Sequence, residues 1–100
     1  MQIKSFRSKA LERFVKTGNP SGICINHAHR LRSIIKDIRT VRFPGQLTQG
    51  GNHQFYPIPR LRLNRQMAKD LWCCRVSGNW RLIFRVEKNQ VFEMDYLDYH

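Results

Sequence analysis

The amino-acid sequence predicts a single α+β domain, with two N-terminal helices packed on a small, mainly antiparallel twisted sheet. Helical periodicity marks the first part of the chain, and strict two-residue alternation marks the last third. Helices followed by strands are typical of the α+β class. A chain of 100 residues can bury one modest core, and no repeat or composition shift divides it. We therefore expect residues 1–100 to form one domain.

The first helix is expected to follow a short strand-like start that Ile3 and Phe6 flank. Its apolar residues recur at helical spacing: Ala10, Leu11, Phe14 and Val15. Gly18 is a natural residue to end this helix, because glycine readily adopts the left-handed conformation common after a last turn. Pro20 and Gly22 then mark a loop.

The second helix is expected to begin with Asn26 as its N-cap and to fade near Thr40, because Pro44 and Gly45 follow. Its apolar stripe consists of Ala28, Leu31, Ile34, Ile35 and Ile38. Basic residues lie off the stripes of both helices, and their plain interpretation is a solvated helix surface.

The segment after the second helix carries few regular signals. Residues 48–54 are polar and rich in glycine, so we expect a loop there. Residues 55–63 contain Pro57 and Pro59 and can form only an edge strand or an irregular segment. The residues that follow, up to Lys69, are densely positive.

Three antiparallel strands are expected at residues 71–76, 80–86 and 91–97, because apolar residues alternate with other residues there. One face of this meander carries Trp72, Cys74, Val76, Trp80, Leu82, Phe84, Val86, Phe92, Met94 and Tyr96. We expect the helices to bury this face and to leave the opposite face exposed.

The register of the first hairpin follows from the side chains that must be buried together. Pairing Val76 with Trp80 leaves residues 77–79 as the loop and places Arg75 directly opposite Arg81. The register expected for the second hairpin pairs Val86 with Phe92, Arg85 with Glu93 and Arg81 with Leu97. Both arginines of the first hairpin should then lie on the exposed face.

Charge is the strongest compositional signal, since 18 Lys and Arg face 7 Asp and Glu and give a formal net charge of +11. A surface this basic favours polyanions through counterion release, so nucleic acid is the expected partner. An acidic protein partner, or a basic surface that serves only solubility, are the alternatives. No apolar run approaches the roughly 18 residues of a membrane span, and the N-terminus lacks the apolar region of a signal peptide. We therefore expect a cytoplasmic protein without membrane contact.

The cysteines indicate neither a disulfide framework nor a metal site. Cys24 stands alone, and the adjacent Cys73 and Cys74 would point to opposite faces of a strand. We interpret all three as reduced cysteines that pack as small apolar side chains, and we expect no metal and no other cofactor.

Arg75 and Arg81 indicate a phosphate site, because like charges directly opposite each other destabilise a sheet unless an anion lies between them. Arginine binds phosphate through two parallel hydrogen bonds and keeps its charge. Next to this pair come Asp98, Tyr99 and His100: a carboxylate, a phenol, and an imidazole that titrates near neutral pH. The alternative is that Asp98 pairs with an arginine and His100 is a frayed chain end.

If RNA is cut at this site, the sequence favours a metal-independent reaction, because its acidic residues are too few and too scattered for two metal ions. The 2′-hydroxyl of RNA would attack the adjacent phosphorus. A base would accept its proton, an acid would protonate the leaving 5′-oxygen, and arginine would stabilise the charge that develops on the phosphate.

Four segments of the chain resemble the HigB-type toxins of the RelE/ParE superfamily: IKSFRSKALERF at residues 3–14, HAHRLRSII at residues 27–35, LWCCRVSGNWRLIFRV at residues 71–86, and the terminal YLDYH. The resemblance covers nearly the whole chain, and V-S-G-N-W-R and the final D-Y-H are its specific parts. It implies a toxin that enters the ribosomal A site and cleaves messenger RNA. It also implies a HigA-like helix-turn-helix antitoxin, through which alone the toxin would contact operator DNA.

The same resemblance implies roles for individual residues. Arg81 would contribute to phosphate and transition-state binding. Asp98, Tyr99 and His100 would contribute to cleavage. The helices and the small antiparallel sheet of the family match the fold expected from the periodicity.

The chain departs from the family in one segment. Members usually carry an H-P-L-K segment before the tryptophan strand, with functional His and Lys, and here these positions are Tyr56 and Pro59. Tyr56 can donate a hydrogen bond, but a phenol with a pKa of about 10 is a poor base at neutral pH. Arg60 or Arg62 can replace the charge of the lysine, and His53 is a nearby candidate to replace the histidine.

Three functions therefore stay open. The first is a ribosome-dependent, metal-independent endoribonuclease. The second is a relative with weak or no cleavage that binds RNA or the ribosome and forms complexes with its antitoxin on operator DNA. The third is a ParE-like inhibitor of DNA gyrase, which the D-Y-H ending disfavours because such an inhibitor needs no acid–base tail.

Overall fold

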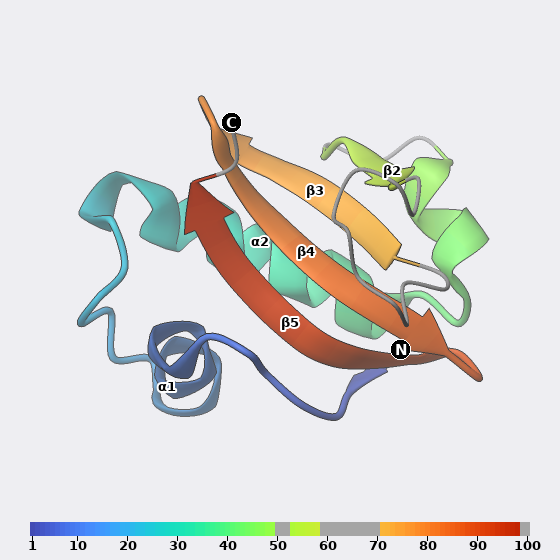
Figure 1. Ribbon diagram of the computed structural model, residues 1–100, viewed down its shortest axis with the longest axis horizontal. Coiled ribbons are helices and arrows are strands. Elements are labelled where there is room, and N and C mark those ends of the chain that lie inside the picture. Colours follow the sequence, from blue (N-terminus) through green and yellow to red (C-terminus); the bar gives the residue numbers. More distant parts are fainter. Residues whose placement is uncertain (50–52, 59–70, 99–100) are drawn as a thin grey trace.

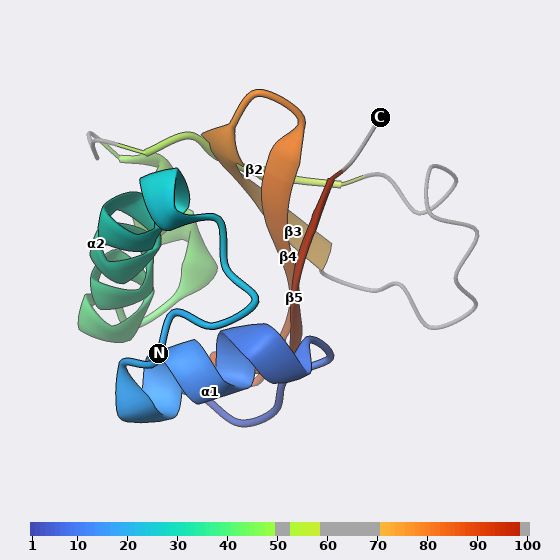
Figure 2. The same ribbon diagram turned by 90° about the vertical axis from the view of Figure 1, so that its left-hand side faces the viewer.

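The computed structural model describes residues 1–49, 53–58 and 71–98 and consists of a helical layer and a sheet (Figure 1). The helices are α1 (Lys9–Thr17) and α2 (Ala28–Thr40). The strands are β1 (Gln2–Ile3), β2 (Phe55–Pro57), β3 (Leu71–Ser77), β4 (Trp80–Glu87) and β5 (Gln90–Asp98). Their order across the sheet is β1-β5-β4-β3-β2, and only the β1–β5 pairing is parallel among the described strands. Both helices lie on one side of the sheet (Figure 2), which confirms the predicted α+β class.

The first predicted helix is confirmed in its position and in its end. Ser8 caps α1 by accepting a hydrogen bond from the backbone N–H of Leu11 (3.1 Å). Gly18 follows the last turn with a φ of 79°, and its N–H donates to the carbonyl of Phe14 (2.9 Å). Leu11 and Phe14 are buried in the core, so the apolar face of α1 is the one that the spacing predicts.

The second helix ends at Thr40 as predicted, but the predicted cap at Asn26 is wrong. Asn26 lies inside a short 3-10 helix, η1 (Ile25–His27), and α2 begins after it. This tight turn carries the side chain of His27 into the core, where its Nδ1 lies 2.6 Å from the hydroxyl of Tyr96. The contact between His27 and Tyr96, which are far apart in the sequence, therefore takes the place of the predicted side-chain cap at Asn26.

The two edge strands agree with the prediction. β1 confirms the strand-like start, and a bridge between Phe6 and Met94 extends its pairing with β5. β2 confirms an edge strand at the beginning of the proline-containing segment, whose later part lies outside the described residues. A second 3-10 helix, η2 (Pro44–Thr48), precedes the predicted polar loop.

The first hairpin confirms the predicted pairing everywhere except at its turn. The core-facing pairs form as expected, and Arg75 lies directly opposite Arg81. Trp80 pairs with Ser77 and not with Val76, because a β-bulge follows Arg75. The bulge shortens the loop to a two-residue turn, a length that suits the right-handed twist of a hairpin.

The second hairpin follows the predicted register only from its C-terminal end up to Ile83. Beyond that point Val86 pairs with Val91, so its predicted pairing with Phe92 is wrong. The cause is a β-bulge at Glu93, which has a φ of 55° and adds one residue to β5. Val91 consequently enters the core, and Phe92 moves to the other face.

The shifted register still preserves the ion pair predicted for this hairpin. The Nε of Arg85 lies 3.7 Å from a carboxylate oxygen of Glu93, although Phe92 is now its cross-strand partner. The same guanidinium lies 4.8 Å from the centroid of the Phe92 ring and also pairs with Glu87. Arg85 therefore belongs to a local charge cluster near the end of the sheet far from Arg81.

The main core lies between the helices and the sheet and includes the apolar stripes of both helices. A second apolar cluster lies on the opposite face, which we call the outer face: Ile58, Leu71, Cys73, Ile83 and Leu97. The prediction of an exposed face is therefore wrong at its centre, where Ile83 is 1% exposed. Among the described residues, no helix is long and apolar enough to cross a membrane.

Candidate functional site

Two arginines from neighbouring strands face each other on the outer face. β3 supplies Arg75 and β4 supplies Arg81, and the two are direct cross-strand partners as predicted. The Arg75 side chain is exposed, whereas Arg81 is half-buried beside the apolar cluster. Two positive charges at this spacing repel each other, and an anion between them would reverse the sign of their interaction.

The guanidinium of Arg81 is oriented by the turn between β3 and β4. Its Nη1 donates to the carbonyl oxygens of Gly78 (2.6 Å) and Trp80 (3.1 Å). Its Nε is buried and has no hydrogen-bond partner in the part of the chain that the structure describes. A buried donor without a partner costs about 1–3 kcal/mol, and a phosphate oxygen is an acceptor that would remove this cost.

Tyr56 brings a phenol to the same arginine from β2. It pairs with Cys73 across the sheet, and the Cys73 thiol donates a hydrogen bond to its hydroxyl (3.2 Å). Burial and the contact with Cys73 raise the pKa of Tyr56 above its ordinary value of 10, while hydrogen bonding and charge from Arg81 oppose the rise. Tyr56 is therefore a neutral phenol at neutral pH, and its O–H is available as a hydrogen-bond donor.

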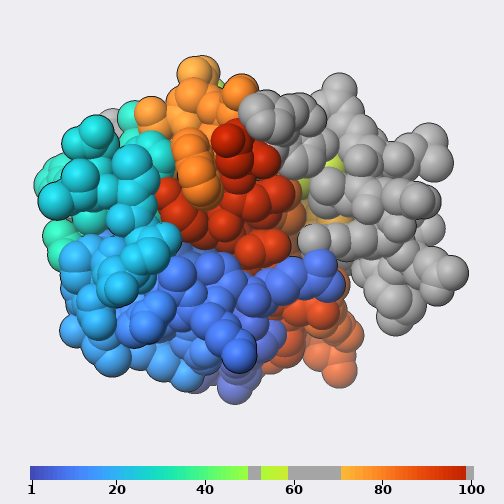
Figure 3. All heavy atoms as spheres, turned by 60° about the vertical axis from the view of Figure 1, so that its left-hand side comes forward, coloured from blue at the N-terminus to red at the C-terminus, as the bar shows by residue number. Residues whose placement is uncertain are grey.

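β5 brings Asp98 to the same end of the sheet. Leu97 is the cross-strand partner of Arg81, and Asp98 follows it as the last residue of β5, opposite Trp80. Alternation along the strand puts Arg81 on the outer face and Asp98 on the helix-covered face. Figure 3 shows the end of β5 at the surface beside the turn between β3 and β4. The two side chains thus flank this end of the sheet from opposite faces.

The other predicted site residues lie outside the described residues: Arg60, Arg62, Tyr99 and His100. Their roles stay predictions, as does the effect of Pro59 at the lysine position. The described part of the candidate site consists of Tyr56, Arg75, Arg81 and Asp98.

The hypothesis that His53 replaces the missing histidine is wrong. Its Nε2 lies 2.9 Å from the hydroxyl of Ser33 and 3.7 Å from a carboxylate oxygen of Asp37, and both partners belong to α2. Its side chain is only 7% exposed on the helix-covered side of the sheet, away from Arg81. Its proximity to Tyr56 in the sequence does not determine the face of the sheet on which its side chain lies, because the side chains of successive strand residues point to opposite faces.

A buried polar contact supports the end of β5, and sequence reasoning missed it. His27 from η1 hydrogen-bonds to Tyr96, and the Trp80 ring stacks on the Tyr96 ring with a centroid separation of 4.6 Å. Burial raises the pKa of Tyr96, and a hydrogen bond from the Cys24 backbone opposes the rise. Because Tyr96 lies two residues before Asp98, this contact holds the end of β5 that carries Asp98 in place. A histidine next to the apolar stripe of α2 was the available signal.

These features together define a small, strongly basic α+β protein with a pair of arginines at one end of its sheet. The chain belongs to the RelE-like toxins of type II toxin–antitoxin systems of the HigB type, whose family model matches residues 4–100. It is 30% identical to the endoribonuclease HigB of Proteus vulgaris over 98 residues, which cover 98% of this chain and 99% of that protein. It is also similar to a metal-bound toxin from Helicobacter pylori, with 14% identity and a TM-score of 0.47 over 100% of this chain and 94% of that one.

Proposed function

We propose that this toxin is a metal-independent endoribonuclease that cleaves messenger RNA on the ribosome. The observation that carries the proposal is the pair Arg75 and Arg81, directly opposite each other next to the strand that leads into Asp98. The membership in a toxin family and the similarity to an endoribonuclease over nearly the full length support it. The net charge of +11 supports binding to RNA and to the ribosome.

The proposed reaction uses the 2′-hydroxyl of the RNA as its nucleophile. The oxygen attacks the adjacent phosphorus while a base takes its proton, and the bond to the leaving 5′-oxygen breaks as an acid protonates that oxygen. The products are a 2′,3′-cyclic phosphate and a 5′-hydroxyl end. DNA lacks the attacking hydroxyl and is not a substrate.

Arg81 is proposed to bind a non-bridging phosphate oxygen through Nε while the turn holds Nη1 in place. Its fixed donor stabilises the negative charge that grows on the phosphate in the transition state. Arg75 adds positive charge from the adjacent strand, and the charge of Arg60 or Arg62 is proposed to replace that of the family lysine. A preorganised guanidinium pays no reorientation cost during the reaction.

The proton transfers are assigned to the C-terminal residues Asp98, Tyr99 and His100. An imidazole suits either transfer, so His100 is proposed to carry a proton, and Asp98 would orient it. Tyr56 donates a hydrogen bond next to Arg81, since its raised pKa keeps it protonated. The carboxylates nearest on β5 are engaged elsewhere: Glu93 with Arg85, and Asp95 with the backbone N–H of Tyr96. This arrangement favours chemistry without a two-metal site.

We further propose that the toxin acts in the cytoplasm and that a HigA-like helix-turn-helix antitoxin neutralises it. Operator DNA would be reached only through that antitoxin. The toxin–antitoxin family supports an antitoxin partner, and the basic surface supports the ribosome as the site of action.

A second candidate is a toxin that binds the ribosome and cleaves weakly or not at all. Two observations favour it: Tyr56 stands where the family carries a histidine, and Asp98 lies on the face of the sheet opposite Arg81. Such a protein would block the A site by occupancy alone. A gyrase inhibitor has no comparable support from the geometry.

Induction of the toxin in cells, with message mapped for new 5′ ends by primer extension, separates these candidates. The wild type is compared with a chain that lacks His100 and with Arg85→Ala, which removes a charge from the far end of the same sheet. We expect growth arrest and new 5′-hydroxyl ends for the wild type and for Arg85→Ala, and a sharp loss of new ends without His100. Arrest without new ends would favour the binding protein. If the wild type caused neither growth arrest nor cleavage, both proposals would be contradicted.

A further inference from the structure

The aromatic ring of Tyr56 has no task in the proposed reaction, which uses only its hydroxyl. Tyr56 lies on the edge strand β2, where its cross-strand partner is Cys73. It shares the outer face of the sheet with Arg75 and Arg81. Among the aromatic side chains of the described residues, only Tyr56, at 39%, and Phe43, at 46%, are exposed. An exposed ring beside two arginines is a surface that can bind a planar ligand.

The hydroxyl of Tyr56 is held by residues of the two neighbouring inner strands. The thiol of Cys73 on β3 donates a hydrogen bond to it (3.2 Å), and Arg81 on β4 supplies a second hydrogen bond and positive charge. Because β3 lies between β2 and β4, the ring extends from the edge of the sheet across β3 towards Arg81. A ring that is fixed in this way gives up little conformational freedom when a ligand binds.

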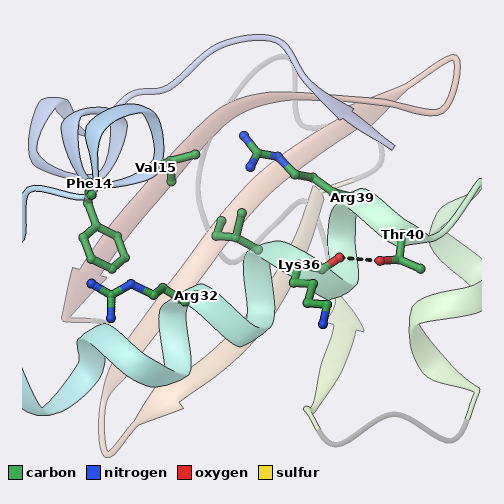
Figure 4. A pocket seen from close by; sticks show the side chains of 8 residues that line it. Phe14, Val15, Arg32, Lys36, Arg39 and Thr40 are labelled. Carbon is green, nitrogen blue, oxygen red and sulfur yellow. Dashed lines mark hydrogen bonds between the residues drawn. The ribbon is translucent and has the colours of Figure 1, made fainter.

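Two other aromatic rings of the described chain lie next to arginines, and in both cases a guanidinium already lies over the ring. In the groove between α1 and α2, Arg32 lies 5.1 Å from the centroid of the Phe14 ring, which is only 4% exposed (Figure 4). On the outer face, Arg85 lies 4.8 Å from the centroid of the Phe92 ring. Arg81 instead meets Tyr56 at its hydroxyl. Tyr56 therefore differs from both rings, since no described cation occupies its face.

We propose that the ring of Tyr56 stacks on a nucleobase of RNA, next to the phosphate that Arg81 binds. The inference rests on the proposed function, because it takes the anion at Arg81 to be a phosphodiester of RNA. Arg81 contacts the hydroxyl of Tyr56, so the ring lies within the length of a nucleotide from a phosphate bound at that guanidinium. Proteins commonly bind single-stranded RNA with an aromatic ring that holds a base beside a basic group that holds the backbone.

The proposed stacking gives Tyr56 a different task from that of the family histidine. It would hold the nucleotide beside the scissile phosphate instead of transferring a proton. Because every base has a flat π face, the contact would tolerate all four bases and would position the strand without reading its sequence. Stacking is present before and during the reaction alike, so it should strengthen binding of the strand more than it raises the rate of cleavage.

The test measures binding to single-stranded oligonucleotides that cannot be cleaved. The probe is a fluorescein-labelled pentamer of deoxythymidylate, which lacks 2′-hydroxyls, and the comparison probe has the same backbone with every base removed. Fluorescence anisotropy at low salt compares the wild type with Tyr56→Leu, Tyr56→Phe and the control Phe43→Leu. Phe43 lies directly before η2, so the control removes an exposed ring from another segment of the chain.

A partly exposed ring should supply the lower end of the range for one stacked base, about five- to tenfold in affinity. We therefore expect Tyr56→Leu to bind the thymidylate about five- to tenfold more weakly than the wild type. Tyr56→Phe keeps the ring and should stay within about twofold, as should Phe43→Leu, and all proteins should bind the baseless probe equally. In the wild type, the ring resonances of Tyr56 should move upfield with the thymidylate and stay in place with the baseless probe.

Three results would overturn the stacking. They are equal binding of the two probes by the wild type, equal losses in Tyr56→Leu and Phe43→Leu, or a loss in Tyr56→Phe as large as in Tyr56→Leu, which would assign the contact to the hydroxyl. The outcome is separable from that of the cleavage proposal, because these probes have no attacking hydroxyl. Stacking without new 5′ ends on the ribosome would contradict only the endoribonuclease, and cleavage without stacking would contradict only this inference.

Discussion

Replacing Arg81 by alanine separates the chemical role of this side chain from its structural role. The structural loss is two hydrogen bonds from Nη1 to carbonyl oxygens at the turn, each worth about 1 kcal/mol or less at a site open to solvent. The substitution also removes a buried unpaired donor and the repulsion with Arg75, which offsets part of that loss. We expect the free energy of unfolding to change by about 1 kcal/mol at most, or roughly 4–8 °C in melting temperature.

The chemical loss should be much larger. Removal of one preorganised donor to a developing oxyanion lowers kcat by about 10²–10³, and Arg81 offers a free Nε in a half-buried position. Single-turnover cleavage of messenger RNA on programmed ribosomes, measured over a range of toxin concentrations, separates the loss in rate from the loss in binding. Arg81→Lys keeps the charge but lacks the second parallel donor, so it should recover only part of the rate.

Arg75→Ala provides the matched control on the neighbouring strand. Its side chain is exposed and makes only a screened electrostatic contribution, so we expect a loss of about threefold to tenfold, mainly in binding and reduced by added salt. The reasoning would be refuted by a folded Arg81→Ala protein that cleaves within about threefold of the wild type. It would also be refuted if the two alanine variants lost rate equally.

Three further substitutions test the surroundings of the site. Tyr56→His should raise the cleavage rate at neutral pH, because an imidazole can act as a base where the raised pKa of Tyr56 prevents it; an unchanged rate in a time course would count against a proton-transfer role there. Tyr96→Phe should lower the free energy of unfolding by about 1–3 kcal/mol, because Nδ1 of buried His27 loses its partner; urea unfolding measures this. Burial lowers the pKa of His53 below 6.5, so the unfolded chain binds its proton more readily and stability falls as the pH drops below that value. His53→Gln should therefore show a smaller drop in melting temperature than the wild type between about pH 7 and 5.

Most of the fold could be predicted from the sequence because burial imposes a regular spacing of apolar residues on helices and strands, and this spacing can be counted. The stripe of α2 and the alternation of β3 and β4 gave both the helix-covered face and the pairing of Arg75 with Arg81. The cluster on the outer face was missed, although Leu82, Ile83 and Phe84 are consecutive apolar residues of one strand. Such a run is typical of a strand buried on both faces.

The errors arose where a distant contact or a single backbone angle decided the local structure. The start of α2 depends on His27 meeting Tyr96, which lies 69 residues away. The position of His53 depends on Ser33 of another element, which no local spacing indicates. The register predicted the phosphate site at Arg75 and Arg81 and the position of Asp98 at the same end of the sheet, whereas the catalytic roles of Arg81 and of the terminal D-Y-H came from the family resemblance.

Glu93 belongs to the charge cluster of Arg85 and forms the β-bulge of β5, and its backbone angle leads to a last prediction. A glutamate with a φ of 55° is in the left-handed region, which costs about 1 kcal/mol for most residues and more for β-branched ones. Glu93→Gly removes that cost but also loses the 3.7 Å contact with Arg85 and adds chain entropy in the unfolded state. We expect these effects to cancel to within about 1 kcal/mol.

Glu93→Val loses the same ion pair and adds a branched side chain that disfavours the left-handed angle. It should unfold about 1–2 kcal/mol more easily than Glu93→Gly, which corresponds to roughly 4–16 °C in melting temperature. Glu93→Gln keeps the shape of the side chain and isolates the contribution of the charge, which should be below about 1 kcal/mol because the contact is exposed. Equal stability of the valine and glycine variants would mean that β5 can pair with β4 without the bulge. In that case the register that places Leu97 opposite Arg81 would not depend on the bulge at Glu93.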